Sequence, residues 1–105
     1  MGFTMRSAEQ GAVTVVQLLG ELDMATAGQL QARLDELTGV DRCRVLLDLS
    51  GLDFCDSAGL NAFIRGERCC RRRGGWLRVT APRDHVATVM RLSGLDEALL
   101  YNAES

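Results

Sequence analysis

Residues 44–60 read RVLLDLSGLDFCDSAGL, and this stretch decides the fold. It opens with an apolar run at 45–49, which is typical of a central β-strand covered by helices. Turn-forming residues follow at 50–53, and an amphipathic helix is expected to begin near Ser57. A buried strand that leads through a short turn into a helix indicates a sheet of the α/β class.

Outward from this stretch, the pattern of apolar residues predicts strands and helices over most of the remaining chain. Alternating or continuous apolar residues indicate strands, whereas spacings of three and four residues indicate helices. Residues 98–101 fit either a last short strand or the start of a terminal helix. The expected elements are strands at 3–6, 13–20 and 76–79, a helix at 25–38, the end of the second helix at Gly74-Gly75, and a third helix from Pro82 to Gly94.

We therefore expect one α/β domain over residues 1–105, with a small mixed β-sheet flanked by helices. The element order is β-β-α-β-α-β-α plus a short C-terminal element. Helices between successive strands imply parallel pairing after the first two strands. One core should bury nine apolar residues: Val15, Leu30, Leu34, Val45, Leu47, Leu60, Ile64, Val79 and Val89.

Composition and charge exclude several classes of protein. The chain has a formal net charge of −2 and a pI near 5.3, whereas nucleic-acid binders normally present a basic field, so no nucleic-acid partner is expected. No apolar run approaches the ~18 residues of a membrane-spanning helix, and the first residues lack the apolar segment of a secretory signal. We expect a cytoplasmic protein without direct membrane insertion; its oligomeric state stays open.

The four cysteines lack the spacing of a metal site or of a disulfide framework. No CxxC motif is present, and the single His85 is distant from the cysteines in sequence, so no metal site is expected. No glycine-rich phosphate-binding loop is present, so no cofactor is expected. Cys43 and Cys55 lie in apolar surroundings and are interpreted as small buried residues. A redox role stays open for Cys55, Cys69 and Cys70.

Candidate site residues gather in two loops, 20–24 and 53–59, which follow predicted strands. In open α/β sheets, binding sites form where the carboxyl ends of strands meet helix N-termini. Asp56 and Ser57 have two interpretations there. Either they cap the helix, or Ser57 is a phosphorylation site, because free N–H groups and the helix dipole tolerate an anion. Asp23 is interpreted as a cap of the first helix.

Catalysis by Ser57 is not expected. The residue lacks the preceding glycine of a nucleophile elbow, and one histidine leaves no choice of general base. A paired-carboxylate site made of Asp23 and Asp56 is conceivable, but the sequence does not give the separation of the two carboxylates.

The run 45–60 closely resembles the STAS domain, the family of bacterial anti-sigma factor antagonists. The resemblance rests on Asp-Ser-Ala-Gly-Leu at 56–60 with its preceding strand. Segments 20–23 and 93–95 also fall where the family has similar sequence, so the resemblance covers nearly the whole chain. Cys55 departs from the family pattern, which usually has an aliphatic residue at that position.

The resemblance implies a partner-switching function for a chain that is not itself an enzyme. In antagonists of this family, the anti-sigma factor is an ATP-dependent serine kinase that phosphorylates the serine matching Ser57. The unphosphorylated antagonist binds that kinase and displaces the sigma factor, and phosphorylation ends the binding. The resemblance thus implies that Asp23, Asp56, Ser57, Ala58 and Gly59 form the partner-binding site.

A second interpretation stays open, because the family also includes domains of anion transporters, stress-signalling complexes and lipid-transport ABC systems. In that case the chain is a scaffold subunit, and Ser57 is not phosphorylated. A serine at the switch position of a free-standing chain favours the sigma-factor branch.

Overall fold

A four-stranded sheet in the order β1-β2-β3-β4 forms the centre of the molecule, whose computed structural model describes residues 2–95 and Leu99. The first two strands pair antiparallel around a turn in which Gly11 takes a left-handed φ of +62°. The other pairs, β2 with β3 and β3 with β4, are parallel. The sheet is therefore mixed, as the sequence predicts. Its strands are β1 (Phe3–Gln10), β2 (Val13–Leu22), β3 (Arg44–Cys55) and β4 (Trp76–Thr80).

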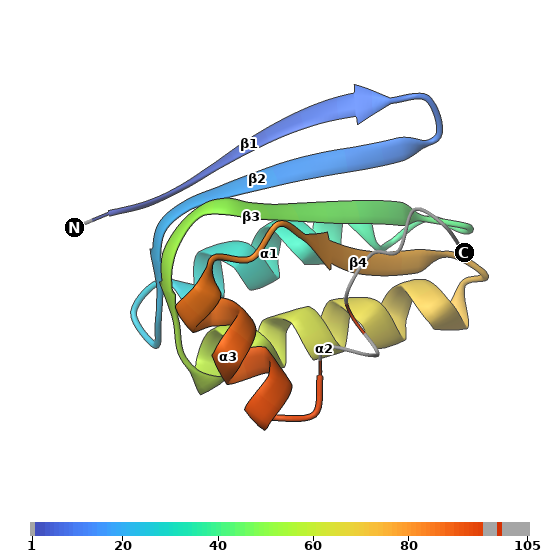
Figure 1. Ribbon diagram of the computed structural model, residues 1–105. Coiled ribbons are helices and arrows are strands. Elements are labelled where there is room, and N and C mark those ends of the chain that lie inside the picture. The colour runs from blue at the N-terminus through green and yellow to red at the C-terminus, as the bar shows by residue number, and fades with distance from the viewer. Residues whose placement is uncertain (1, 96–98, 100–105) are drawn as a thin grey trace.

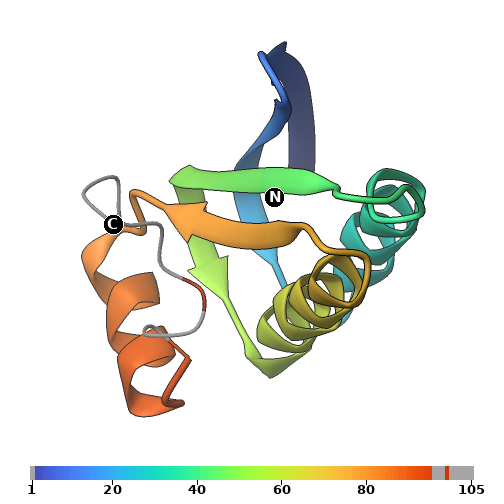
Figure 2. The same ribbon diagram turned by 90° about the vertical axis from the view of Figure 1, so that its right-hand side faces the viewer.

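Three helices complete the fold: α1 (Ala27–Leu37), α2 (Ser57–Arg72) and α3 (Asp84–Leu92). The first two lie side by side on one face of the sheet, and α3 packs against β3 (Figure 1). Figure 2 looks along the axes of α1 and α2 and shows α3 standing apart from them. The predicted order β-β-α-β-α-β-α is confirmed. None of the helices in the described residues is long and apolar enough to cross a membrane.

The core lies between the sheet and the helices. Six of the nine residues expected there are buried, including Leu30 and Leu34, which confirms the predicted inward face of α1. Val15, Ile64 and Val89 keep partial exposure at the margin of the core. In α2 the buried side is set by spacings of three and four, as expected for a helix that packs on a sheet; the buried residues of α2 are Gly59, Leu60, Ala62, Phe63, Gly66 and Cys70.

The prediction of a turn at 50–53 was wrong, because β3 continues through these residues to Cys55. The pairing with β2 shifts register twice in this stretch, and Gly51 pairs with Leu19. Asp48 Oδ1 accepts a hydrogen bond from Ser50 N at 2.9 Å, a contact usually found in turns. The turn-forming residues thus bend a long strand without ending it.

Other boundaries differ by a few residues. β1 continues past its expected end at residue 6 to Gln10, and α1 begins two residues later than expected, at Ala27. Pro82 was expected in the first turn of α3, but Arg83 is extended and the helix begins at Asp84. The prediction for residues 98–101 lies outside the described residues, except that Leu99 is buried.

Candidate functional site

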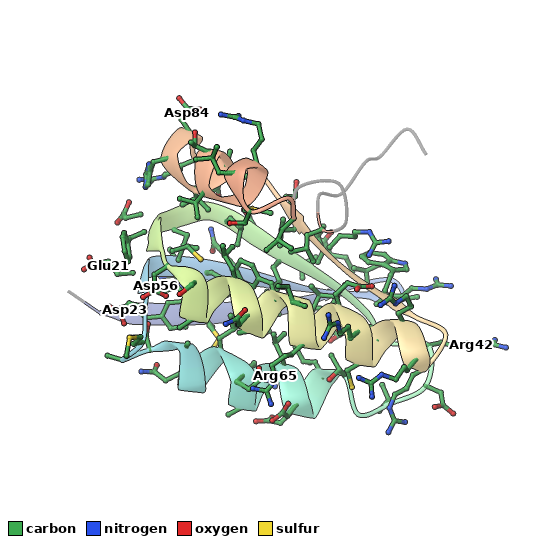
Figure 3. The ribbon with its side chains drawn as sticks, turned by 90° about the horizontal axis from the view of Figure 1, so that it is seen from below. Glu21, Asp23, Arg42, Asp56, Arg65 and Asp84 are labelled. Carbon is green, nitrogen blue, oxygen red and sulfur yellow. The ribbon has the colours of Figure 1, made fainter. Side chains whose placement is uncertain are left out.

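The parallel pairing of β2 and β3 brings the two candidate loops together. Leu22 pairs with Cys55, and Asp56 N donates a hydrogen bond to Leu22 O at 3.1 Å. The next residue after Leu22 is Asp23, so Asp23 and Asp56 leave neighbouring strands at the same end of the sheet. Figure 3 shows Glu21, Asp23 and Asp56 gathered at this end of the molecule. The two segments predicted to carry the site therefore lie side by side at this end of the sheet.

Asp23 stabilises the turn that leads into α1. Its Oδ1 accepts hydrogen bonds from Ala25 N at 2.9 Å and from Thr26 N at 3.2 Å. Thr26 Oγ1 in return accepts from Asp23 N at 2.9 Å. The N-cap position of α1 itself belongs to Thr26, whose side chain makes no capping bond. Asp23 therefore satisfies backbone donors just before the helix, and Met24 is left at the exposed tip of the turn.

Asp56 and Ser57 separate into two different environments. Asp56 is the N-cap of α2, and its Oδ1 accepts from Ala58 N at 2.9 Å and from Gly59 N at 3.3 Å. Ser57 is the first residue of the helix and is exposed. No partner within residues 2–95 and Leu99 hydrogen-bonds to its hydroxyl. The capping interpretation therefore describes Asp56, and the Ser57 hydroxyl has no hydrogen-bond partner among the described residues.

Gly59 and Ala58 occupy different environments in the first turn of α2. Gly59 is buried, and a Cβ atom built on it would lie 2.7 Å from Cys55 Sγ and 2.7 Å from Leu22 Cδ2. Only a residue without a side chain lets α2 begin this close to the two strand ends. Ala58 is partly exposed and faces the groove between α1 and α2. Gly59 therefore allows the first turn of α2 to pack closely against Cys55 and Leu22, whereas Ala58 lies at the surface.

A groove of about 220 Å³ runs from this turn between α1 and α2. Small residues line it near Ser57, namely Ala27 and Gly28 on one helix and Ala58 on the other. Arg65 lines it further along α2 and is labelled in Figure 3. The groove therefore begins at Ala58, the residue that follows Ser57.

Two large apolar side chains within the candidate segments 20–24 and 53–59 were not identified as site residues from the sequence. Met24 is 84% exposed and Phe54, which pairs with Glu21 at the end of β3, is 45% exposed. Exposed large apolar residues that adjoin a polar site often mark a protein-binding surface. The exposure of Met24 could have been predicted, because this residue lies before α1 and outside the pattern of apolar residues that forms the buried face of that helix. That of Phe54 could not, because the sequence placed it in a loop.

Cys55, two residues before Ser57, is one of the cysteines for which the sequence allows a redox role. Burial, followed by the negative charge of Asp56, raises the pKa of the Cys55 thiol from 9.0 to about 12. The thiol is buried and lies 3.6 Å from Asp56 O. A thiolate is the reactive form of cysteine, so this environment keeps Cys55 unreactive near neutral pH.

α3 is tied to the same end of the sheet through Arg83 and His85. The Arg83 guanidinium contacts the Asp53 carboxylate, and its Nε donates to Ser50 O at 2.9 Å. His85 Nε2 contacts Asp53 O. His85 is exposed in the first turn of a helix, as predicted. Within residues 2–95 and Leu99, no group of three or more His, Cys, Asp or Glu side chains could hold a metal ion.

Comparison with known proteins agrees with this geometry. A family model described as "Mlab, STAS domain" matches residues 5–101. The chain is 28% identical, over 106 aligned positions, to the anti-sigma F factor antagonist of Paenibacillus polymyxa, covering 99% of this chain and 91% of that protein. The crystal structure of an anti-sigma factor antagonist from Mycobacterium paratuberculosis matches with a TM-score of 0.85 and 27% identity, over 97% of this chain and 87% of that one. The unphosphorylated form of the anti-sigma factor antagonist SpoIIAA shares the fold, with a TM-score of 0.78 and 21% identity over 98% and 90% of the two chains.

Proposed function

The chain belongs to the STAS domain family, and from this premise we propose that it is an anti-sigma factor antagonist switched off by phosphorylation of Ser57. Its partner is an anti-sigma factor that acts as an ATP-dependent serine kinase in the cytoplasm. The γ-phosphoryl group of ATP passes to Ser57 Oγ while its bond to the β-phosphate oxygen breaks, and a base of the kinase takes the hydroxyl proton. The chain is thus a substrate and supplies no catalytic group.

One observation carries this proposal: the Ser57 hydroxyl is exposed at the first residue of α2 and makes no hydrogen bond within the part of the chain that the structure describes. A serine that capped the helix would be held by backbone N–H groups, and phosphorylating it would cost those bonds. Asp56 already performs the capping. Ser57 can therefore be modified without unfolding the first turn of α2.

The contact surface for the unphosphorylated chain surrounds this serine. Met24 and Phe54 provide large exposed apolar side chains of the types that are enriched in the cores of protein interfaces. Asp23, Asp56 and Ala58 complete the surface around Ser57, and Gly59 holds the turn in place from within. The partner thus covers a surface of apolar and acidic side chains that includes the serine hydroxyl.

The same geometry explains why a phosphate would end the binding. A phosphoserine carries about −1.5 to −2 charges. Free backbone N–H groups at a helix N-terminus normally stabilise an added anion. Here the N–H groups of Ala58 and Gly59 already donate to Asp56, and the carboxylate of Asp23 lies at the same end of the sheet. The phosphate would therefore be desolvated beneath the partner in a negatively charged setting.

The test measures phosphorylation and affinity on the same set of variants. Wild type, Ser57→Ala and Ser57→Asp are incubated with the cognate kinase and ATP, phosphate is located by mass spectrometry, and affinity is measured by calorimetry. Each tenfold loss of affinity corresponds to ~1.4 kcal/mol, and we expect phosphorylated wild type and Ser57→Asp to bind about a hundredfold more weakly than unmodified wild type. Ser57→Ala should bind normally and take up no phosphate.

Ser7→Asp is the matched control, because it adds the same charge at an exposed serine of β1 whose hydroxyl accepts a hydrogen bond from Arg33 Nη2. This variant should bind like wild type. Phosphate on another residue, or equal affinity of the phosphorylated and unmodified proteins, would refute the switch. Co-purification with an ABC ATPase, together with binding that ignores changes at Ser57, would instead establish the scaffold-subunit interpretation.

A further inference from the structure

Three cysteines gather at the end of the molecule opposite Ser57. Cys69 and Cys70 lie in the last part of α2, and Cys43 comes directly before β3. The Sγ atoms of Cys43 and Cys69 lie 3.9 Å and 3.6 Å from the same acceptor, Thr38 O. The two sulfurs are therefore no farther apart than the sum of these distances. Figure 3 shows Arg42, the neighbour of Cys43, at the end opposite Asp56.

The backbone around these thiols is fixed by hydrogen bonds between distant parts of the chain. Arg42 N donates to Arg73 O at 2.7 Å, so the segment before β3 is attached to the end of α2. Trp76 N donates to Cys43 O at 2.8 Å and attaches the same segment to the start of β4. Cys43 is thus held against the helix end that carries Cys69.

The three thiols differ in their access to solvent. Cys43 is 5% exposed and Cys70 is fully buried, whereas Cys69 keeps partial exposure. Burial, followed by a hydrogen bond with Cys43, raises the pKa of the Cys70 thiol above its ordinary value. Cys70 therefore stays protonated and shielded, and Cys69 is the thiol that a small oxidant in solution can reach.

We propose that Cys69 and Cys43 form a disulfide when the protein meets a hydroperoxide. The Cys69 thiolate attacks the peroxide oxygen, the O–O bond breaks, and the released hydroxide is protonated to water (an alcohol, for an organic peroxide). Cys69 is left as a sulfenic acid. The Cys43 sulfur then attacks the Cys69 sulfur, its proton leaves with the sulfenic hydroxide as water, and the S–S bond forms. Two thiols are oxidised and one peroxide is reduced.

Cys43 is the cysteine that attacks the oxidised Cys69, because it lies directly before β3 and next to the end of α2. Cys69 and Cys70 are consecutive helical residues, whose side chains do not face each other, so a bridge between them would distort the helix. Cys43 comes from a different element, and its thiol hydrogen-bonds to Cys70 and shares the acceptor Thr38 O with Cys69. Of the two helix cysteines only Cys69 keeps partial exposure, so Cys69 is oxidised first and Cys43 attacks it. The two thiols could also have a purely structural role, because both donate hydrogen bonds to the backbone carbonyl oxygen of the buried Thr38. The experiment separates these two functions.

The experiment treats the folded wild-type protein with dilute hydrogen peroxide, blocks remaining thiols with an alkylating reagent and measures the intact mass. We expect the loss of two hydrogen atoms, two alkylated cysteines fewer than in the untreated protein, and reversal by dithiothreitol. Trypsin leaves Cys69 and Cys70 on one peptide, since the sequence between Arg68 and Arg71 contains both. Assignment of the bridge therefore depends on matched alanine variants.

Cys69→Ala should lose the cross-link, whereas Cys70→Ala and Cys55→Ala should keep it, with circular dichroism confirming that each variant is folded. Cys55 is the control because it lies at the Ser57 end of the molecule and its environment keeps it protonated. A cross-link that survives in Cys69→Ala, or that disappears in Cys70→Ala, would overturn the assignment. Thiols that stay unoxidised, or that reach sulfinic acid without a bridge, would show that the cysteines only satisfy Thr38. The outcome does not depend on the partner or on Ser57.

Discussion

Replacing Gly59 with alanine would place a methyl group against two buried side chains at the base of the site. The added Cβ would lie 2.7 Å from Cys55 Sγ, 2.7 Å from Leu22 Cδ2 and 2.8 Å from Leu22 Cγ. Leu22 is fully buried and Cys55 is 4% exposed, so neither can move into solvent to make room. The methyl group therefore forces α2 away from the ends of β2 and β3, or distorts the packing of both side chains.

The net effect on stability is a difference of two terms. Overpacking of a core costs about 1–3 kcal/mol. Replacing glycine by alanine in a helix contributes up to about 1 kcal/mol in the opposite direction. We expect Gly59→Ala to lower the free energy of unfolding by about 1–2 kcal/mol, which for a domain of this size lowers Tm by roughly 4–15 °C.

Gly28→Ala provides the matched control, because Gly28 is also in the first turn of a helix and has nothing within 4 Å of its added Cβ. This variant should raise the free energy of unfolding by about 0.5–1 kcal/mol. The assay is urea unfolding followed by circular dichroism, with thermal midpoints as a second measure. The two substitutions are chemically identical, so any difference between their effects on the free energy of unfolding comes from the packing around each glycine. We expect the two effects to have opposite signs. A Gly59→Ala protein as stable as wild type would show that the first turn of α2 is not packed as described.

Two further predictions concern the same end of the sheet. Asp56→Ala removes the hydrogen bonds to Ala58 N and Gly59 N and should lower the free energy of unfolding by about 1 kcal/mol. Asp84→Ala, in a first turn without a side-chain cap, should lower it by a few tenths of a kcal/mol. Equal losses in urea titrations would contradict the capping geometry. Above pH 9 the protein should lose stability, because the pKa of Cys55 is raised to about 12 and the folded state then holds a proton that the unfolded state releases. This thiol lowers the free energy of unfolding by at most about 1.4 kcal/mol per pH unit. Unfolding titrations near neutral pH and near pH 10 should show a smaller loss of stability in Cys55→Ala than in wild type.

Most of the fold was predictable because local pattern and final packing agree. The spacing of Leu30 and Leu34 identifies the inward face of α1, and both residues are buried. The apolar run at 45–49 identifies the central strand, which pairs on both sides. The error at 50–53 has a physical cause: Ser-Gly-Leu-Asp has the composition of a turn, but Leu52 is buried and the stretch pairs with β2. Pairing with a distant strand overrode the local preference.

The candidate site was predictable in position but not in detail. Strand ends and helix starts located Asp23 and Asp56, because their chain positions follow from the topology. Which residue caps α2 depends on where the helix begins, and a shift of one residue exchanges Asp56 for Ser57. The shared carbonyl contact of Cys43 and Cys69 joins residues that the sequence keeps far apart, with Thr38 31 positions from Cys69. Such a contact follows from tertiary packing and has no local signature.

α2 connects the two proposed sites of modification, because Ser57 begins the helix and Cys69 lies near its end. The helix has 16 residues, so its ends are about 24 Å apart. Close packing fixes it in the middle: a Cβ atom on Gly66 would lie 2.9 Å from Leu77 Cδ1 and 3.1 Å from Leu34 Cδ1, both on buried side chains. A helix held this tightly can slide or rotate only by displacing the core. We therefore expect the proposed disulfide at the cysteine end to leave the geometry around Ser57 unchanged, so that the two proposed modifications act independently.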